Sequence, residues 1–396
     1  MFAGVEGVDH ATTVGVAGTD DDPDRSGRSE RIKVRATVPL PMRTIEWDDE
    51  RDCIVMVDQT KLPAEYTTYH AETVPDLIDS IQRLRVRGAS GLGAAGAYGV
   101  ALATRRTDAG DFEAFVDAVA ADAEAIATAR PTAVNLSKEV DSLLGVLRGC
   151  TSIPEARERT LAAAEELADV DVARNRRLGE HGAELLTDGD TVMTHCNAGA
   201  LATVDWGTAL GIVYSAHEAG TRVDVIANET RPLNQGARIT TVELADHGVE
   251  TTLVPDNASG LCMQRGMVDA VVVGADRVVL DGGAEFGDRG VVFNKIGTYK
   301  HAVLAARHDV PFVVAAPHAT IDTERSADEV EIEERDGDEL REIYGTQNAP
   351  AETAVYNPAF DATPMELVDY LVTETGVYEP PLDRTTFEAE ADRAAP

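Results

Sequence analysis

The stretch Thr191-Val192-Met193-Thr194-His195-Cys196-Asn197-Ala198-Gly199-Ala200 marks the first strand-to-helix unit of an α/β pattern. An apolar strand signal over residues 191–193 runs into a single cysteine, and small residues with a helical pattern to residue 219 follow. A thiol in this position would lie beside free backbone N–H groups and the positive end of a helix dipole, which both favour the thiolate. The stretch therefore predicts a reactive Cys196, although most cysteines are simply small buried hydrophobes.

The same alternation of apolar strands and helical runs continues along the chain. Continuous apolar strands that alternate with helices are typical of a parallel sheet covered on both faces. We therefore expect an α/β fold with a Rossmann-like, doubly wound domain over residues 173–378. The expected strands are 191–193, 224–227, 250–254, 270–273 and 311–315, and the expected helices run to 219, over 235–247, near 260 and over 295–308.

The first half of the chain has a different character. Residues 1–40 indicate a disordered acidic tail, and residues 379–396 indicate an acidic C-terminal tail. Between them, residues 41–172 predict a mostly helical domain that begins with a short β-hairpin of strands 45–47 and 54–57. The expected helices of this domain follow Leu77 to Leu84 and then cover 91–105, 111–129, 134–148 and 154–169. The acidic segment 323–347 reads as a long surface connection.

The charge of the chain bounds its environment and its partners. Its 396 residues hold 35 basic and 70 acidic side chains, a net charge of −35, and lysine occurs only at positions 33, 61, 138, 295 and 300. Molar salt shortens the Debye length to roughly 3 Å and relieves such self-repulsion, so the composition predicts a halophilic source. A cationic partner is the alternative, but the acidic residues are spread along the chain rather than clustered. No basic patch for nucleic acid is evident.

Cysteine spacing and hydropathy restrict the class of protein further. The four cysteines at 53, 150, 196 and 262 show no zinc-type spacing and suggest no disulfide framework, which favours a reducing cytoplasm. No apolar run of about 18 residues predicts a membrane span, and the N-terminus lacks the features of a signal peptide.

Unusual residues follow several of the expected strands, and ligands bind beyond the carboxyl ends of strands in such sheets. Asp276 follows an all-apolar strand, where desolvation would raise its pKa and suit it to general acid or base work; a helix cap or an ion pair with Arg277 is the alternative. The segment Arg87-Gly88-Ala89 opens a helix and resembles an anion cradle, although small residues there also suit helix packing. Further donors expected at helix starts are Arg130, Gln235, Arg238, Asn294 and Lys295.

Neither a metal cluster nor a dinucleotide fingerprint stands out in the sequence. We therefore expect chemistry without a cofactor on a phosphorylated polyol, in which a proton or hydride moves within one substrate.

A series of motifs in order carries a family resemblance over residues 44–375. With these motifs the chain resembles the methylthioribose-1-phosphate isomerases, a family related to ribose-1,5-bisphosphate isomerase and to regulatory subunits of translation initiation factor 2B. The motifs are Asp58–Pro63, Val86–Ala89, Arg130–Leu136, Thr194–Asn197, Glu229–Pro232, Gln235–Arg238, Gly274–Arg277, Asn294–Tyr299 and Asn357–Pro364.

The resemblance implies a function and a set of site residues. It implies an aldose–ketose isomerase of methionine salvage that acts on a phosphorylated pentose, works as a homodimer and needs no cofactor or metal. It implies Cys196 and Asp276 as the catalytic pair. The implied substrate contacts are Arg87, Gly88, Ala89, Arg130, Gln235, Asn294 and Lys295.

Three departures and three alternatives stay open at this point. The extra tail 1–40, Ser90-Gly91 beside the cradle and an insertion near 280–292 depart from the family pattern. The chain could instead isomerise ribose 1,5-bisphosphate or 5-deoxyribose 1-phosphate, or it could be a regulatory subunit without turnover.

Overall fold

The structure, a computed structural model, describes residues 42–382 and 387. The predicted tail 1–40 lies outside this range, as does most of the predicted tail 379–396. Within that stretch the structure describes residues 379–382 and Phe387, and Phe387 is buried against the rings of His318 and Tyr378.

A three-stranded antiparallel sheet opens the described chain. It consists of β1 (Ile45–Asp48), β2 (Cys53–Val57) and β3 (Thr68–Ala71). The predicted hairpin is confirmed, because β1 pairs with β2 and Ile45 lies opposite Met56. The sequence did not indicate β3, whose four residues, TYHA, are too few and too mixed to show an alternation.

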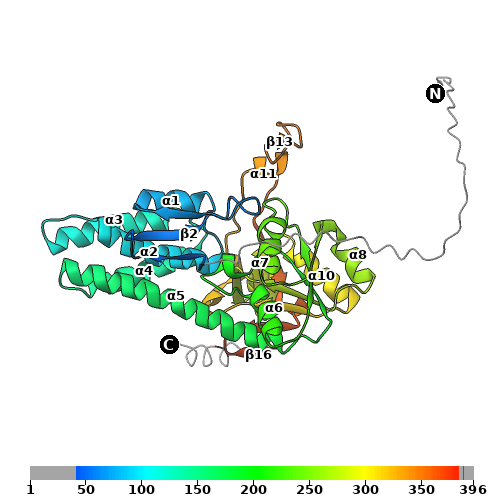
Figure 1. The fold of residues 1–396 in the computed structure, drawn as a ribbon. Helices are drawn as coiled ribbons and strands as arrows, with labels where there is room; N and C mark the ends of the chain where they lie inside the picture. The colour runs from blue at the N-terminus through cyan, green and yellow to red at the C-terminus, as the bar shows by residue number, and fades with distance from the viewer. Residues whose placement is uncertain (1–41, 383–386, 388–396) are drawn as a thin grey trace, which may run out of the picture. The chain divides into compact units, whose positions relative to one another are not determined.

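Five helices follow this sheet, and four of them pack around the second, α2 (Figure 1). In α2 every residue from Gly91 to Thr104 is buried, because small side chains let the neighbouring helices approach on all sides. A Cβ added at Gly96 would lie 2.7 Å from the Leu136 carbonyl oxygen, so glycine sets how close α2 and α4 can come. The five are α1 (Val74–Gln82), α2 (Ala89–Arg106), α3 (Phe112–Ala127), α4 (Val134–Arg148) and α5 (Ile153–Ala183).

Helix α5 is longer than the predicted helix 154–169 and contains the proposed domain boundary between residues 172 and 173. The apolar period fades after residue 169, but the helix continues because its last turns pack on α6 (Ala209–Glu218). Glycine makes this contact close: a Cβ at Gly179 would lie 2.4 Å from the Ser215 hydroxyl oxygen, and one at Gly182 would lie 2.4 Å from Ile212.

The second half of the described chain is built on a seven-stranded sheet, and the expected parallel α/β sheet is confirmed. Its order is β16-β15-β10-β7-β4-β5-β6, and all neighbours are parallel except β15 and β16. The chain turns outward in opposite directions from β4 and β7, so the topological switch point lies between these two strands. The strands are β4 (Thr191–Thr194), β5 (Asp224–Asn228), β6 (Thr251–Val254), β7 (Ala270–Gly274), β10 (Phe312–Ala315), β15 (Tyr370–Thr373) and β16 (Gly376–Tyr378).

Helices cover both faces of this sheet, as the alternation along β7 shows. Val272 belongs to a core cluster with residues of α6, whereas Val271 and Val273 belong to a second cluster with residues of α8 and α10. The helices around the sheet are α6, α7 (Thr241–Asp246), α8 (Ser259–Gln264) and α10 (Thr298–His308), and a π-helical turn, Gly236–Thr240, precedes α7.

A four-stranded sheet of order β11-β8-β9-β14 follows the end of β7 and corrects two predictions. Asn294 and Lys295 end strand β9 rather than begin a helix, because Gly297, with φ of 104°, separates the strand from α10. The acidic segment 323–347 is more than a connection, since it includes the end of β11. The remaining strands and α-helices are β8 (Arg277–Asp281), α9 (Gly283–Phe286), β9 (Val291–Lys295), β11 (Ile321–Ser326), α11 (Asp338–Arg341), β12 (Glu342–Ile343), β13 (Thr346–Gln347) and β14 (Phe360–Pro364).

No helix within the described residues is long and apolar enough to cross a membrane.

Candidate active site

A cavity of about 470 Å³ opens at the carboxyl ends of β4 and β7, where the strand order reverses. All nine residues predicted as catalytic or substrate-binding line this cavity. They are Cys196, Asp276, Arg87, Gly88, Ala89, Arg130, Gln235, Asn294 and Lys295.

Cys196 lies just beyond β4 in an unusual backbone conformation. Its φ is +69°, in the left-handed region that non-glycine residues avoid. Two hydroxyl groups hold this conformation: the Cys196 N–H donates to Thr230 Oγ1 at 2.8 Å, and its carbonyl oxygen accepts from Thr240 Oγ1 at 2.7 Å. The amide of Gln235 approaches the sulfur at 3.4 Å. The side chain is partly exposed and faces the cavity.

The expectation that Cys196 lies at the start of a helix is wrong. A loop and a short 3-10 turn, Ala200–Ala202, follow the cysteine, and α6 begins only at Ala209. Gly199 and Gly207 pair across this loop in an isolated antiparallel bridge before the helix starts. The small residues after Cys196 therefore serve a tight loop rather than a helix N-terminus.

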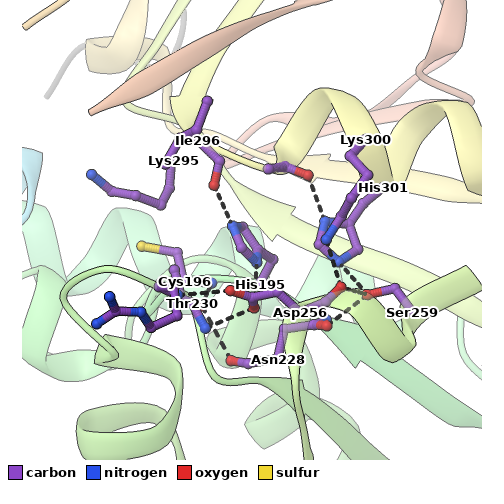
Figure 2. A network of polar contacts seen from close by, with 12 residues as sticks. His195, Cys196, Asn228, Thr230, Asp256, Ser259, Lys295, Ile296, Lys300 and His301 are labelled. Atoms are coloured by element: carbon purple, nitrogen blue, oxygen red, sulfur yellow. Dashed lines mark hydrogen bonds and ion pairs between the residues drawn. The ribbon is translucent and has the colours of Figure 1, made fainter. Parts of the chain in front are cut away.

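Figure 2 shows the network of polar contacts around Cys196 and His195. His195 Nε2 lies 2.8 Å from the carbonyl oxygen of Ile296, and its ring lies 4.6 Å from the ring of His301. Burial lowers the pKa of His195 to about 4, so this imidazole is neutral at neutral pH. Asp256 accepts from the backbone N–H of Thr230 at 2.8 Å and so fixes the residue that holds Cys196. The network therefore positions Cys196 through residues that follow three strands: Thr230 after β5, Asp256 after β6 and Ile296 after β9.

Asp276 lies opposite, beyond β7. Its side chain is open to the cavity, but the protein around the cavity removes much of the bulk water, and this desolvation raises the pKa of the carboxyl. Lys295 and Arg130 oppose the rise, because each places a positive charge nearby. The raised pKa that the sequence suggested for Asp276 is therefore present in the structure.

The N-terminus of α2 forms one wall of the cavity. Gly88 has φ of +83°, and a Cβ there would lie 2.0 Å from the Ala202 carbonyl oxygen, so the position requires glycine. No side chain caps this helix, and Gly88, Ala89 and Ser90 all line the cavity. Free N–H groups at the start of an 18-residue helix favour an anion at this place.

Arg87 is held against the same wall by a chain of buried polar groups. Its guanidinium donates to Asn197 Oδ1, and Asn197 Nδ2 in turn donates to Glu243 Oε1 at 2.7 Å. Burial raises the pKa of Glu243, and the nearby charge of Arg87 opposes that rise. No pattern in the sequence predicts this role for Asn197 or Glu243, because a polar residue within a helical run such as Glu243 gives no sign that it faces the interior.

Lys295 and Asn294 reach the cavity from the end of β9. Lys295 is buried; its ammonium donates to the Ala359 carbonyl oxygen at 2.8 Å and lies 4.4 Å from the centre of the Phe360 ring. Burial lowers the pKa of Lys295, whereas Cys196 and Asp276 act in the opposite direction. In Figure 2 the Lys295 ammonium and the Cys196 sulfur point to the same side of the network.

The cavity is rich in positive charge although the chain is acidic. Six cationic side chains line it, against three acidic ones. Such a concentration of cations within an acidic protein attracts a small anion to this site. The cations are Arg87, Arg130, Lys138, Arg277, Lys295 and Arg325, and the acids are Asp276, Asp322 and Glu324. Within the described part of the chain, no group of three or more metal-ligating side chains is arranged to hold a metal ion.

A thiol and a carboxyl lie at the switch point of a parallel sheet in an α/β fold, and cationic side chains line the cavity between them. A protein with this fold and site is suited to bind a small anionic ligand. Residues 85–380 match the model of the initiation factor 2 subunit family. The chain belongs to this family.

Curated relatives match most of the chain. A putative methylthioribose-1-phosphate isomerase from Archaeoglobus fulgidus is 51% identical over 335 residues, which cover 85% of this chain and 95% of that protein. A methylthioribose-1-phosphate isomerase from Thermosipho melanesiensis is 44% identical over 338 residues, with coverage of 85% and 95%.

Solved structures share the fold. The crystal structure of 5-methylthioribose 1-phosphate isomerase from Pyrococcus horikoshii OT3 has a TM-score of 0.80 and 36% identity, and it covers 90% of this chain and 96% of that one. A crystal structure described as translation initiation factor eIF-2B, subunit delta, from A. fulgidus has a TM-score of 0.78 and 49% identity, with coverage of 89% and 99%.

Proposed function

We propose that this protein is an aldose–ketose isomerase that converts 5-methylthioribose 1-phosphate into 5-methylthioribulose 1-phosphate, in methionine salvage. The observation that carries the proposal is the cavity in which Cys196 and Asp276 face a cationic wall at the sheet's switch point. The curated relatives with this name, at 43–51% identity over 84–85% of the chain, support the same activity.

The substrate's phosphate is assigned to the wall formed by the α2 N-terminus. The free N–H groups at Gly88 and Ala89 and the guanidinium groups of Arg87 and Arg130 provide the positive field that a phosphate requires. Gln235, Asn294 and Lys295 line the same cavity, and we assign them to contacts with the sugar hydroxyls.

The reaction must begin by opening the ring, because a phosphate on the anomeric oxygen prevents a free aldehyde. Protonated Asp276 gives its proton to the ring oxygen as the bond to C1 breaks, and C1 becomes cationic. The raised pKa of Asp276 suits this step, since a larger fraction of the carboxyl is protonated at neutral pH.

Hydrogen then moves from C2 to C1 by one of two routes. In the proton route Cys196 acts as the base that removes the C2 proton to give an enol phosphate and returns it to C1, while Asp276 takes the C2 hydroxyl proton and regains its acid form. In the hydride route the hydrogen moves directly from C2 to C1, Asp276 again takes the hydroxyl proton, and Cys196 shapes and shields the site.

The experiment measures the turnover of methylthioribose 1-phosphate and of ribose 1,5-bisphosphate by the purified protein in molar KCl. NMR follows the formation of the ketose product. Faster turnover of the first substrate supports the proposal. Faster turnover of the second refutes it in favour of the bisphosphate isomerase and implies a second phosphate site. The rim cations Arg277 and Arg325 are the residues that could form one, although both lie within 4 Å of Asp322.

A regulatory subunit without turnover is the other class of function, which the initiation-factor description of the 49% identical structure keeps open. Two features argue for an enzyme: the strained Cys196 backbone and a carboxyl with a raised pKa lie in one cavity. Absence of turnover with all three candidate substrates, including 5-deoxyribose 1-phosphate, would support the regulatory class instead.

We also propose that two copies associate in the cytoplasm of a halophilic cell. Exposed apolar side chains gather on α8, α10 and β6, where Leu253, Leu261 and Val303 are 50%, 47% and 41% exposed. β6 is also an edge strand of the large sheet, and an exposed edge favours pairing with another chain. Light scattering after size-exclusion chromatography tests this: a dimer mass that Leu261→Asp converts to a monomer supports the surface, and a monomer in the wild type refutes it.

A further inference from the structure

Glu333 is an acidic residue of the segment 323–347 whose carboxylate contacts two cavity-lining residues, Arg130 and Thr132, instead of solvent. Its side chain is only 16% exposed, although most of its acidic neighbours are solvent-exposed. A carboxylate rarely loses contact with water unless cations or donors surround it. The donors that surround the Glu333 carboxylate therefore indicate its structural role.

The Glu333 carboxylate holds the turn that carries Arg130. Oε2 accepts from Arg130 Nη2 at 3.1 Å and from Thr132 Oγ1 at 2.9 Å, and both of these residues line the cavity. Oε1 accepts from Arg335 Nη1 at 2.8 Å, so both carboxylate oxygens are fixed. This arrangement ties a loop between α3 and α4 to a segment about 200 residues further along the chain.

The backbone of the same residue reaches the other side of the cavity. The Glu333 carbonyl oxygen accepts from the Ala359 N–H at 2.8 Å, and the Ala359 carbonyl oxygen accepts from Lys295 Nζ, also at 2.8 Å. Glu333 thus connects to Arg130 directly and to Lys295 through one intermediate residue.

We propose that Glu333 is a positioning residue for the isomerase, which holds Arg130 and, through Ala359, Lys295 in place around the phosphorylated substrate. This inference rests on the proposed function, because it gives Arg130 and Lys295 their roles in binding. Without Glu333 the Arg130 side chain would be free to turn to other acidic groups, and its distance from the substrate would no longer be fixed.

The negative charge of Glu333 also affects the pKa of Asp276. The groups that act most on Asp276 are Lys295, Arg130, Arg277 and Glu333, and of these four only Glu333 raises its pKa. Removal of the negative charge therefore lowers the pKa of Asp276. If Asp276 acts in its acid form, the alkaline limb of the kcat profile moves to lower pH.

The experiment compares full-length wild type with Glu333→Gln, Glu333→Asp and the control Glu334→Gln, whose side chain is exposed on the adjacent position. We expect Glu333→Gln to raise KM about tenfold or more, because misplaced binding groups lose affinity and orientation, and to shift the alkaline limb to lower pH. Glu333→Asp keeps the charge, so its limb should stay at the wild-type pH while KM rises. Glu334→Gln should match the wild type in both.

A second readout separates this inference from the proposed reaction. Calorimetric titration with inorganic phosphate measures anion binding without turnover, and we expect about tenfold weaker binding for Glu333→Gln. Weaker phosphate binding with an inactive wild type would refute the reaction but support the positioning. Phosphate affinity and KM equal to wild type in Glu333→Gln, or an unshifted alkaline limb, would overturn the inference.

Discussion

The glycine at the start of α2 offers the sharpest test of how the cavity is built. We expect Gly88→Ala to damage both stability and activity, because two constraints act at one position. The backbone φ of +83° is costly for alanine, by about 1–3 kcal/mol. In addition, the new Cβ would lie 2.0 Å from the Ala202 carbonyl oxygen, at least 1 Å closer than real Cβ contacts.

Relief of this contact must separate the α2 N-terminus from the loop that follows Cys196. A displacement of about 1 Å is enough to cost about 100-fold in rate where groups must meet a substrate accurately. We therefore expect the free energy of unfolding to fall by about 2–4 kcal/mol and kcat/KM to fall by about 100-fold. Denaturant unfolding followed by circular dichroism measures the first, and the NMR isomerase assay measures the second.

Gly145→Ala is the matched control for this prediction. Gly145 lies inside α4, has no heavy atom within 4 Å of an added Cβ, and has no positive φ, so alanine there should stabilise the protein by up to about 1 kcal/mol and leave activity unchanged. The reasoning is refuted if Gly88→Ala unfolds within about 0.5 kcal/mol of the wild type and keeps its kcat/KM within about threefold, margins within which surface substitutions usually fall.

Cys196→Ser should lower kcat at least ~100-fold if the thiol transfers the proton, and a rate near that of the wild type would exclude the proton route. Burial raises the pKa of Asp171 to about 6. Protonation of Asp171 therefore contributes in full to the free energy of unfolding below the unfolded pKa of about 3.9, and this contribution is lost as the pH rises through about 6. Between pH 4 and 7, Asp171→Asn should therefore gain up to about 3 kcal/mol in unfolding free energy relative to the wild type, whereas the exposed Asp141→Asn should not; parallel pH dependences would contradict this account. The melting temperature should rise between low salt and molar KCl because screening weakens the self-repulsion of a chain with net charge −35, and a constant melting temperature would argue against a halophilic origin.

The sequence-based expectations and the structure differ at the end of α5 and at the start of α10. The end of α5 was predicted too early because its last turns are stabilised by glycine contacts with α6, which sequence periodicity does not record. Lys295 is expected at a helix start from the sequence, yet it ends β9, which pairs with β14 and with β8. Both errors concern contacts with segments far away in the chain.

The sequence alone determined the α/β alternation and the strand ends that carry Cys196 and Asp276. These features depend on local information: side-chain periodicity, strand length and the position of glycine. The full set of nine candidate site residues came from the family resemblance of its motifs, and all nine lie along one cavity. Tertiary structure alone decided how Cys196 is held in a left-handed conformation, how Arg87 connects to Glu243, and that Glu333 contacts Arg130 across 203 residues of chain. The physical reason is that such contacts arise from the order in which strands enter the sheet, and no local pattern of residues records that order.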